Sequence, residues 1–197
     1  MVAVIALLLV YYYAIYEDGS LKVKDNALVN VEENWLVGQR SGGKNSRYYH
    51  FADVQLPEGY ETTDGTTSGL VQSFTGEKDG VRLSITPVGS SVQDMISNVY
   101  GTITAFVGEN GTVSAVQDAD TKLGAAKYFV YTNSMDAEDG SKQYSKSTVL
   151  YAPANYSDSC ILISTYAPAD SEEALPADDA LLAEVYKAID GIVLAEK

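Results

Sequence analysis

The sequence predicts an α+β domain in which an antiparallel β-sheet is packed by two helices. Three observations support this class: short runs that alternate apolar and polar residues, turn dipeptides between those runs, and two longer stretches with apolar residues at helical spacing. Short turns join successive strands, and helical crossovers between them are missing, which is the pattern of an antiparallel sheet.

The predicted strands are the alternating runs. Val81 to Pro87 has a period of two, as a strand with one buried face requires. Dipeptides such as Asp79-Gly80, Asn110-Gly111 and Asp139-Gly140 separate the runs and favour tight turns. The full set of predicted strands is Phe51 to Leu56, Leu70 to Phe74, Val81 to Pro87, Thr112 to Val116, Lys127 to Thr132, Tyr144 to Tyr151 and Ser159 to Tyr166.

The first predicted helix spans residues 91–106. Ser91 is its expected N-cap, with Asp94 three positions further on. We expect Val99→Asp to cost several kcal/mol of stability, because it would place an unpaired charge on the stripe that faces the sheet. The predicted apolar stripe consists of Val92, Ile96, Val99, Ile103 and Phe106.

The second predicted helix spans residues 178–194 and covers the same core. Acidic residues in its first turn suit the positive end of a helix dipole. Its apolar residues at helical spacing are Leu181, Val185, Ala188, Ile189 and Ile192.

Residues 1–16 contain no charged side chain and have the composition of a membrane anchor. As a helix they would be about 24 Å long, which is shorter than the ~30 Å hydrocarbon core, but tyrosines at the distal end extend the segment into the interface. A cleaved signal peptide would need a basic start and a small-residue cleavage site, and the segment has neither. We therefore expect an uncleaved anchor, with a buried apolar element of the domain as the alternative.

The rest of the chain divides into two parts. Residues 17–49 are polar and irregular and read as a stalk that merges into the fold, with a short strand at 27–31. Residues 50–197 show no internal repeat and no change in composition, so they are expected to form a single domain.

The strand and helix order from residue 50 onward, together with the opening segment Phe51 to Tyr60, resembles the PsbP-like fold. The segment reads FADVQLPEGY: an apolar strand that ends in Leu-Pro, followed by Gly and an aromatic residue. The resemblance implies an antiparallel sheet between helices that serves as a docking scaffold, as in photosystem extrinsic subunits, envelope lipoproteins and a small-GTPase-binding factor. It carries no functional residue over to this chain.

The charge balance argues against nucleic acid as a partner. The chain has 13 Lys and Arg against 27 Asp and Glu, a net charge of −14, so a phosphate backbone would be repelled. The acidic residues are scattered, which is typical of a solvated surface.

We identify no catalytic, cofactor-binding or metal-binding residue. Cys160 is the only cysteine and lies in an apolar run, so we expect a small buried side chain. His50 is the only histidine and is expected on the surface or on an edge strand. Asp118 and Asp120 are expected in a turn.

Two segments resemble ligand loops without matching them. Residues 38–45 nearly spell a phosphate-binding loop, but a strand and not a helix is predicted after them. Residues 136–140 fail the spacing of a calcium loop and are expected to form a hairpin turn.

Tyrosine is the one unusual count, with 15 Tyr against 4 Phe. Half-buried rings at the rim of the sheet explain it, and the alternative is a tyrosine-lined recognition face for a protein or glycan.

These observations predict a monomeric, membrane-anchored binding or accessory module of the bacterial cell envelope, without enzymatic activity or cofactor. Its partner is expected to be a protein or a cell-wall component. Lys22 and Lys24 favour a cytosolic domain, but long domains cross membranes largely regardless of charge, and we expect the extracytoplasmic side. The alternatives are a hydrolase that uses a pair of carboxylates and a purely structural surface spacer.

Overall fold

The computed structural model describes residues 20–21, 23–24, 27–28, 30–40, 47–63, 71–137, 139–156 and 158–196. The predicted anchor, residues 1–16, lies outside this part of the chain. Among the described residues, no helix combines the length and the apolar character needed to cross a bilayer.

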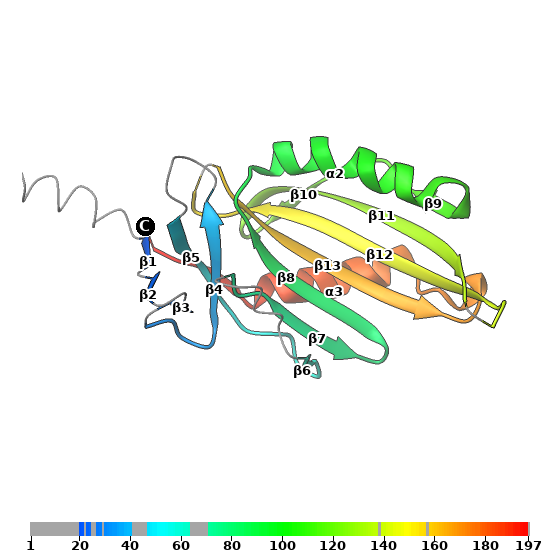
Figure 1. Ribbon diagram of the computed structural model, residues 1–197, viewed down its shortest axis with the longest axis horizontal. Helices are drawn as coiled ribbons and strands as arrows, with labels where there is room; N and C mark the ends of the chain where they lie inside the picture. Colours follow the sequence, from blue (N-terminus) through cyan, green and yellow to red (C-terminus); the bar gives the residue numbers. More distant parts are fainter. Residues whose placement is uncertain are drawn as a thin grey trace, which may run out of the picture.

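The α+β class is confirmed: a large and a small antiparallel sheet are packed by two helices, α2 (Val92–Val107) and α3 (Asp178–Asp190) (Figure 1). The strand order in the large sheet is β10-β11-β12-β13-β8-β7-β6, with β9 also paired to β11. Its strands are β6 (Glu61–Thr63), β7 (Phe74–Lys78), β8 (Val81–Val88), β9 (Gly111–Val113), β10 (Gln117–Thr121), β11 (Gly124–Asp136), β12 (Lys142–Pro153) and β13 (Cys160–Ala169).

The small sheet is centred on β5 (Arg47–Val54), which pairs with three short strands. These are β1 (Ser20–Leu21), β4 (Trp35–Arg40) and β14 (Ile192–Leu194). A separate hairpin joins β2 (Val23–Lys24) to β3 (Ala27–Leu28), and two 3-10 turns are η1 (Gly108–Asn110) and η2 (Glu172–Ala174).

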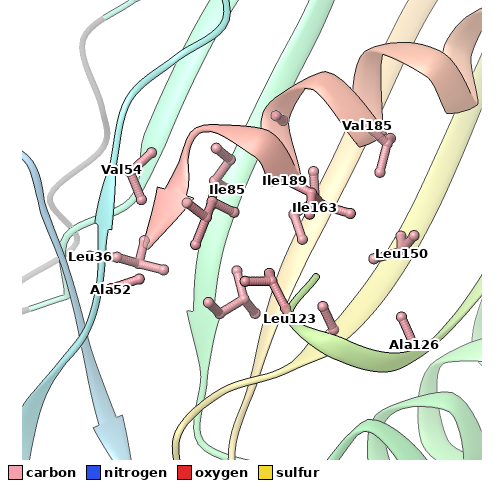
Figure 2. Packing of buried hydrophobic residues seen from close by; sticks show 14 of the residues in the cluster. Leu36, Ala52, Val54, Ile85, Leu123, Ala126, Leu150, Ile163, Val185 and Ile189 are labelled. Atoms are coloured by element: carbon pink, nitrogen blue, oxygen red, sulfur yellow. The ribbon is translucent and has the colours of Figure 1, made fainter. Parts of the chain in front are cut away.

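The two helices pack on opposite faces of the large sheet. Along β12, Leu150 packs in the cluster that contains Val185 of α3, whereas its neighbour Val149 packs in the cluster that contains Ile96 of α2. Successive strand residues point to opposite faces, so α2 and α3 cover different sides. Figure 2 shows the α3 side, where Val185 and Ile189 lie close to Ile163.

The small sheet adds its own residues to the α3-side core. Leu36 of β4 and Ala52 of β5 are fully buried and belong to the same cluster as Ile85 of the large sheet (Figure 2). Strand β4 and residues 47–49 of β5 fall within the region 17–49, which was expected to be a stalk that merges into the fold, and they belong to the small sheet. The apolar signal there is only three residues long, Trp35 to Val37, which is too short to stand out in the sequence.

The second helix was predicted to reach residue 194, but it ends at Asp190, and this boundary is a correction. Gly191 follows, and β14 then pairs antiparallel with Ala52 to Val54. A Cβ atom on Gly191 would lie 2.0 Å from the Gln55 carbonyl oxygen, so the backbones meet directly at this position. Ile192 is buried in β14, and the predicted helix also required a buried residue here, which is why its helical spacing was misleading.

One turn and the bounds of one strand were also predicted wrongly. Asp118 and Asp120 lie in β10 and not in a turn, and they point outward at the edge of the large sheet. The strand predicted at residues 70–74 begins instead at Phe74 and continues through polar residues to Lys78. Strands β10 and β7 both carry charged side chains at exposed positions. Their apolar residues are therefore too few to mark the bounds of either strand in the sequence.

The cap and the hairpin turns were predicted correctly. The Ser91 hydroxyl accepts a hydrogen bond from the Asp94 backbone N–H at 3.2 Å, which confirms the N-cap of α2. The turn between β7 and β8 has Asp79 and Gly80 at positive φ, and Gly140 does the same between β11 and β12.

The phase of the first helix differs at its C-terminal end from the predicted stripe. Val107 is 1% exposed and packs inward, whereas Phe106 is 64% exposed. Val99 is half-buried at the side of the stripe. The residues that face the sheet therefore continue from Ile103 to Val107, four positions on, and not to Phe106.

We expect Val107→Asp to lower the free energy of unfolding by several kcal/mol, because it buries an unpaired carboxylate. Phe106→Asp should change it by less than about 0.5 kcal/mol, as for other exposed positions, and Val99→Asp should fall between the two. Urea denaturation of the three variants checks this order. Equal losses for Val107 and Phe106 would show that the helix phase is wrong.

Candidate functional site

The α2 side of the large sheet is only partly covered. Helix α2 packs on β9, β11 and β12, while α3 packs on β12 and β13 from the opposite side. Across the sheet, strands β13, β8 and β7 continue past the edge of α2, as Figure 1 shows. We call the uncovered α2-side surface of these three strands the open face; it consists of Ser164, Tyr166, Arg82, Ser84, Thr86 and Thr75, with Glu77 at its outer border.

The register of the sheet aligns side chains across the open face. Tyr166 lies opposite Ser147 on one side and Arg82 on the other. Arg82 lies opposite Glu77, and Glu77 lies opposite Glu61 of β6. Partners in an antiparallel pair share a face, so a row of aromatic, hydroxyl and charged groups crosses the sheet.

One flank of α2 adds apolar groups beside the open face. On the other flank, the Tyr100 hydroxyl donates to the Ser114 carbonyl at 3.0 Å, so that flank faces the outer edge of β11. At 3.6 residues per turn, Met95, Val99 and Phe106 lie on the flank opposite Tyr100. The flank that carries Met95, Val99 and the exposed Phe106 ring therefore lies beside the open face.

A depression of about 250 Å³ lies at one end of the open face. Met135 and Tyr166, which are 54% and 41% exposed, both line it. The other lining residues are Gln143, Tyr144, Ser145, Pro168, Ala169 and Asp170.

Exposed apolar side chains are concentrated on this side of the molecule. Five large apolar side chains are exposed among the described residues, and Phe106, Met135 and Tyr166 all lie on the α2 side. The other two are Tyr186 on α3 and Val193 on β14. Rings and thioethers beside hydroxyl groups suit non-covalent recognition.

A pair of carboxylates lies at the far edge of the sheet. Glu61 and Glu77 are directly opposite each other and line a cavity of about 480 Å³ together with Lys78 and Asp79. Both glutamates are exposed, and the remaining lining residues are glycines and Thr62. The cavity therefore lacks the apolar wall that keeps a catalytic carboxyl protonated in hydrolases.

Tyr60 connects the turn after β5 to helix α3. Its hydroxyl donates to Glu184 Oε2 at 3.1 Å, and the Lys187 ammonium donates to Oε1 of the same carboxylate at 2.5 Å. Burial, and then the negative charge of Glu184, raise the pKa of Tyr60 well above its usual range. Burial works to raise the pKa of Glu184, but hydrogen bonds from Lys187 and Tyr60 outweigh it and lower the pKa. These contacts indicate a brace between two elements.

His50 stacks on Trp35 in the small sheet, with ring centroids 4.1 Å apart and planes 13° apart. Its Nε2 lies 3.1 Å from Asp53 Oδ1. A register shift between β4 and β5 leaves Phe51 as an extra residue, which brings His50 and Asp53 to the same face. Because β5 has partners on both edges, His50 is not on an edge strand, but its side chain is partly exposed at 20%.

Cys160 is fully buried beside Tyr151, as the sequence predicted. Burial raises the pKa of the Cys160 thiol to about 12 and the pKa of Tyr151 also to about 12. A thiol that stays protonated at neutral pH is a poor nucleophile.

We expect the protein to lose stability as the pH rises above about 9. The unfolded thiol ionises near pH 8.5 and unfolded tyrosine near pH 10, whereas the buried groups stay neutral until about pH 12. Raised acid pKa values therefore give full stability below about pH 8.5. Above about pH 8.5 Cys160 causes a loss of up to about 1.4 kcal/mol per pH unit, and above about pH 10 Tyr151 adds a loss of the same size. Cys160→Ala should reduce this slope between pH 9 and 10 in urea melts, and an unchanged slope would contradict the assignment to Cys160.

The two loop-like segments carry no ligand site in the described structure. Residues 38–40 of the near phosphate-binding loop belong to β4, and residues 41–46 lie outside the described residues. In the predicted hairpin turn, Asp139 Oδ1 accepts hydrogen bonds from the Ser141 hydroxyl and backbone N–H, which lower the pKa of Asp139. Within the described ranges, no three His, Cys, Asp or Glu side chains are grouped as metal ligands would be.

Comparison with known proteins adds little. No family model and no curated protein matches the sequence. Among solved structures, one similar chain is LpqN of Mycobacterium tuberculosis, described as involved in cell envelope biogenesis. The likeness covers 74% of this chain and 83% of LpqN, at 9% identity and a TM-score of 0.44. A likeness at this level supports no conclusion about function.

Proposed function

We propose that this chain is a non-enzymatic accessory module that binds a protein or a cell-wall component through the open face. The observation that carries the proposal is the partial cover of the sheet: on its side α2 packs on Cys160 and Leu162 of β13 and Val88 of β8 but leaves the rest of these strands and β7 uncovered. The exposed side chains of Phe106, Met135 and Tyr166 lie on this side. Exposed apolar groups rimmed by polar residues mark interaction sites.

The two alternatives fit these observations less well. A purely structural spacer would have no reason to expose apolar side chains on one side of the molecule. A hydrolase would need a carboxyl group in an apolar pocket, and the pair formed by Glu61 and Glu77 is exposed in a polar cavity.

The proposal includes a location. We infer from the composition of residues 1–16 that the module is tethered to the membrane, with the domain on the extracytoplasmic side of the cell envelope. Protease treatment of intact cells that express the natural gene should cleave the domain. Cleavage only after lysis would place it in the cytosol. The PsbP-like resemblance stays a prediction.

Site-specific photo-crosslinking tests the use of the open face. A benzophenone amino acid replaces Tyr166 in one variant and Tyr186 in another; the two side chains have similar exposure, 41% and 36%, but lie on opposite sides of the sheet. On illumination in intact cells, position 166 should give a discrete adduct and position 186 should not. Equal labelling at both positions, or none at 166, would contradict the proposed function.

A further inference from the structure

We infer that the occupant of the open face is a cationic amphipathic helix of a partner protein, which lies beside α2 on the sheet. This inference rests on the proposed function and names the chemistry of the partner. It is carried by the dimensions of the uncovered strip, the apolar groups along it and the charges around it.

The open face, which is the strip of the sheet that α2 leaves uncovered, has the width of one helix. Three strands about 4.8 Å apart give a strip of about 14 Å, and a helix with its side chains is about 10–12 Å across. The apolar face of a sheet is usually covered by another layer, and helices are a common choice. One helix beside α2 would complete the layer that α2 begins.

The strip is also long enough for such a helix. Cys160 and Leu162 of β13 and Val88 of β8 already pack in the cluster with α2, so the uncovered parts are residues 163–169 of β13 and 81–87 of β8. At about 3.4 Å per residue, these stretches span roughly 24 Å. At 1.5 Å per residue, that length matches a helix of about 16 residues.

Apolar groups line the position that the apolar stripe of this helix would take. The flank of α2 offers Val99 and Phe106, and the sheet offers Tyr166, with Leu162 at the margin where α2 already packs. The hydroxyl groups of Ser84 and Ser164 form the half-buried floor between them. A mixed floor of this kind is typical of interfaces that form and dissociate.

The charges around the strip favour a cationic partner. Glu61, Glu77 and Asp79 border it along β6, β7 and the following turn, and Asp170 lies at the end of β13. Arg82 is the one base among the residues of the strip, where it lies opposite Glu77, and Lys78 lies at the same border as Glu61, Glu77 and Asp79. The chain as a whole carries −14, which attracts positive partners and repels a second copy.

The test uses the full chain in nanodiscs of zwitterionic lipid, with empty nanodiscs as the blank. The probe is a labelled 18-residue peptide of leucine and lysine, with leucine at a spacing of three and four. One control peptide carries glutamate in place of lysine, and another has the same composition with leucine at every second position. Fluorescence anisotropy should show saturable binding of the first peptide alone, and the binding should weaken as salt is added.

Matched variants locate the binding site. Tyr166→Ala should weaken binding about tenfold, whereas Tyr186→Ala on α3 should leave it unchanged. Glu77→Gln should weaken binding about threefold and reduce the salt dependence, because it removes one charge from the border. Asp179→Asn makes the same change in net charge on α3, which covers the opposite face of the sheet, and should have no effect. Thermal melts confirm that each variant is folded.

Several outcomes would overturn the inference while leaving the proposed function intact. Equal binding of the lysine and glutamate peptides would contradict the cationic partner, and equal binding of the two lysine peptides would contradict the helix. Binding of soluble N-acetylglucosamine oligomers that depends on Tyr166 would make the partner a glycan. Sedimentation of the chain as a dimer that Tyr166→Ala dissociates would make it a second copy. The proposed function fails separately, if position 166 gives no adduct in cells.

Discussion

Val185→Asp is expected to unfold the protein at room temperature. Val185 has 0% exposure and lies in the cluster of α3 with Leu150 and Ile163, as Figure 2 shows. The substitution removes apolar contacts and places a carboxylate among apolar side chains such as Leu150 and Ile163. A buried unpaired charge costs several kcal/mol, which is a large part of the 5 to 15 kcal/mol that typically stabilise a domain.

The neighbouring residue supplies the control for this variant. Tyr186 is 36% exposed on the outer side of the same helix, so Tyr186→Asp should shift the midpoint of a urea melt only slightly. Near-ultraviolet circular dichroism should show lost tertiary packing for Val185→Asp alone. A folded Val185→Asp variant with an unchanged melt would mean that α3 does not pack on the sheet as described.

Gly38→Val is expected to have an effect of similar size for a different reason. Strand β4 crosses β8 so closely that a Cβ atom on Gly38 would lie 2.5 Å from Pro87 Cβ and 2.9 Å from Phe51 Cε2. All three positions are buried, so the strands would have to separate. Overpacking of this kind costs about 1–3 kcal/mol, and more where the backbone cannot move.

Gly101→Ala provides the matched control for Gly38→Val. Gly101 lies inside α2, and beyond its chain neighbours and the adjacent backbone of the helix no described atom lies within 4 Å of the position that its Cβ would take. Alanine at an exposed position inside a helix should stabilise the protein by about 0.5–1 kcal/mol. Opposite shifts in melting temperature are therefore expected for the two variants. Stabilisation by both would show that β4 does not approach β8.

Local signals in the sequence predicted the parts of the fold that depend on neighbouring residues. The Ser91 cap, the Asp79-Gly80 turn and the Asp139-Gly140 turn are set by hydrogen bonds and φ angles within a few residues. The α+β class was predicted from the same turns, because short turns between alternating runs are typical of an antiparallel sheet.

The parts that were wrong depend on contacts between distant segments. Strand β14 forms because β5 offers it an unpaired edge, and the helical spacing of Ile192 gives no hint of this. Strand β10 is held by its ladder with β11, although Asp118 and Asp120 give it little apolar character. Tertiary pairing overrode the local preference in each case.

The open face could not be predicted from the sequence for a related reason. Its strands were identified in part, and the count of tyrosines suggested a recognition face. Which strands remain uncovered depends on where α2 lies across the sheet, and this is a tertiary property. The exposure of Phe106 was missed because its spacing fits the buried stripe nearly as well as that of Val107.

The most direct test of the account is the accessibility of the open face in the purified full chain and in intact cells. Cys160 is fully buried, so a maleimide should report on single introduced cysteines at Tyr166 and at Tyr186. In the purified protein, both Tyr166→Cys and Tyr186→Cys should react quickly. In cells, the account predicts that Tyr166→Cys is protected while Tyr186→Cys still reacts. Equal labelling of the two variants in cells, at the rates seen for the purified protein, would show that nothing covers the open face and would contradict its role as a binding surface.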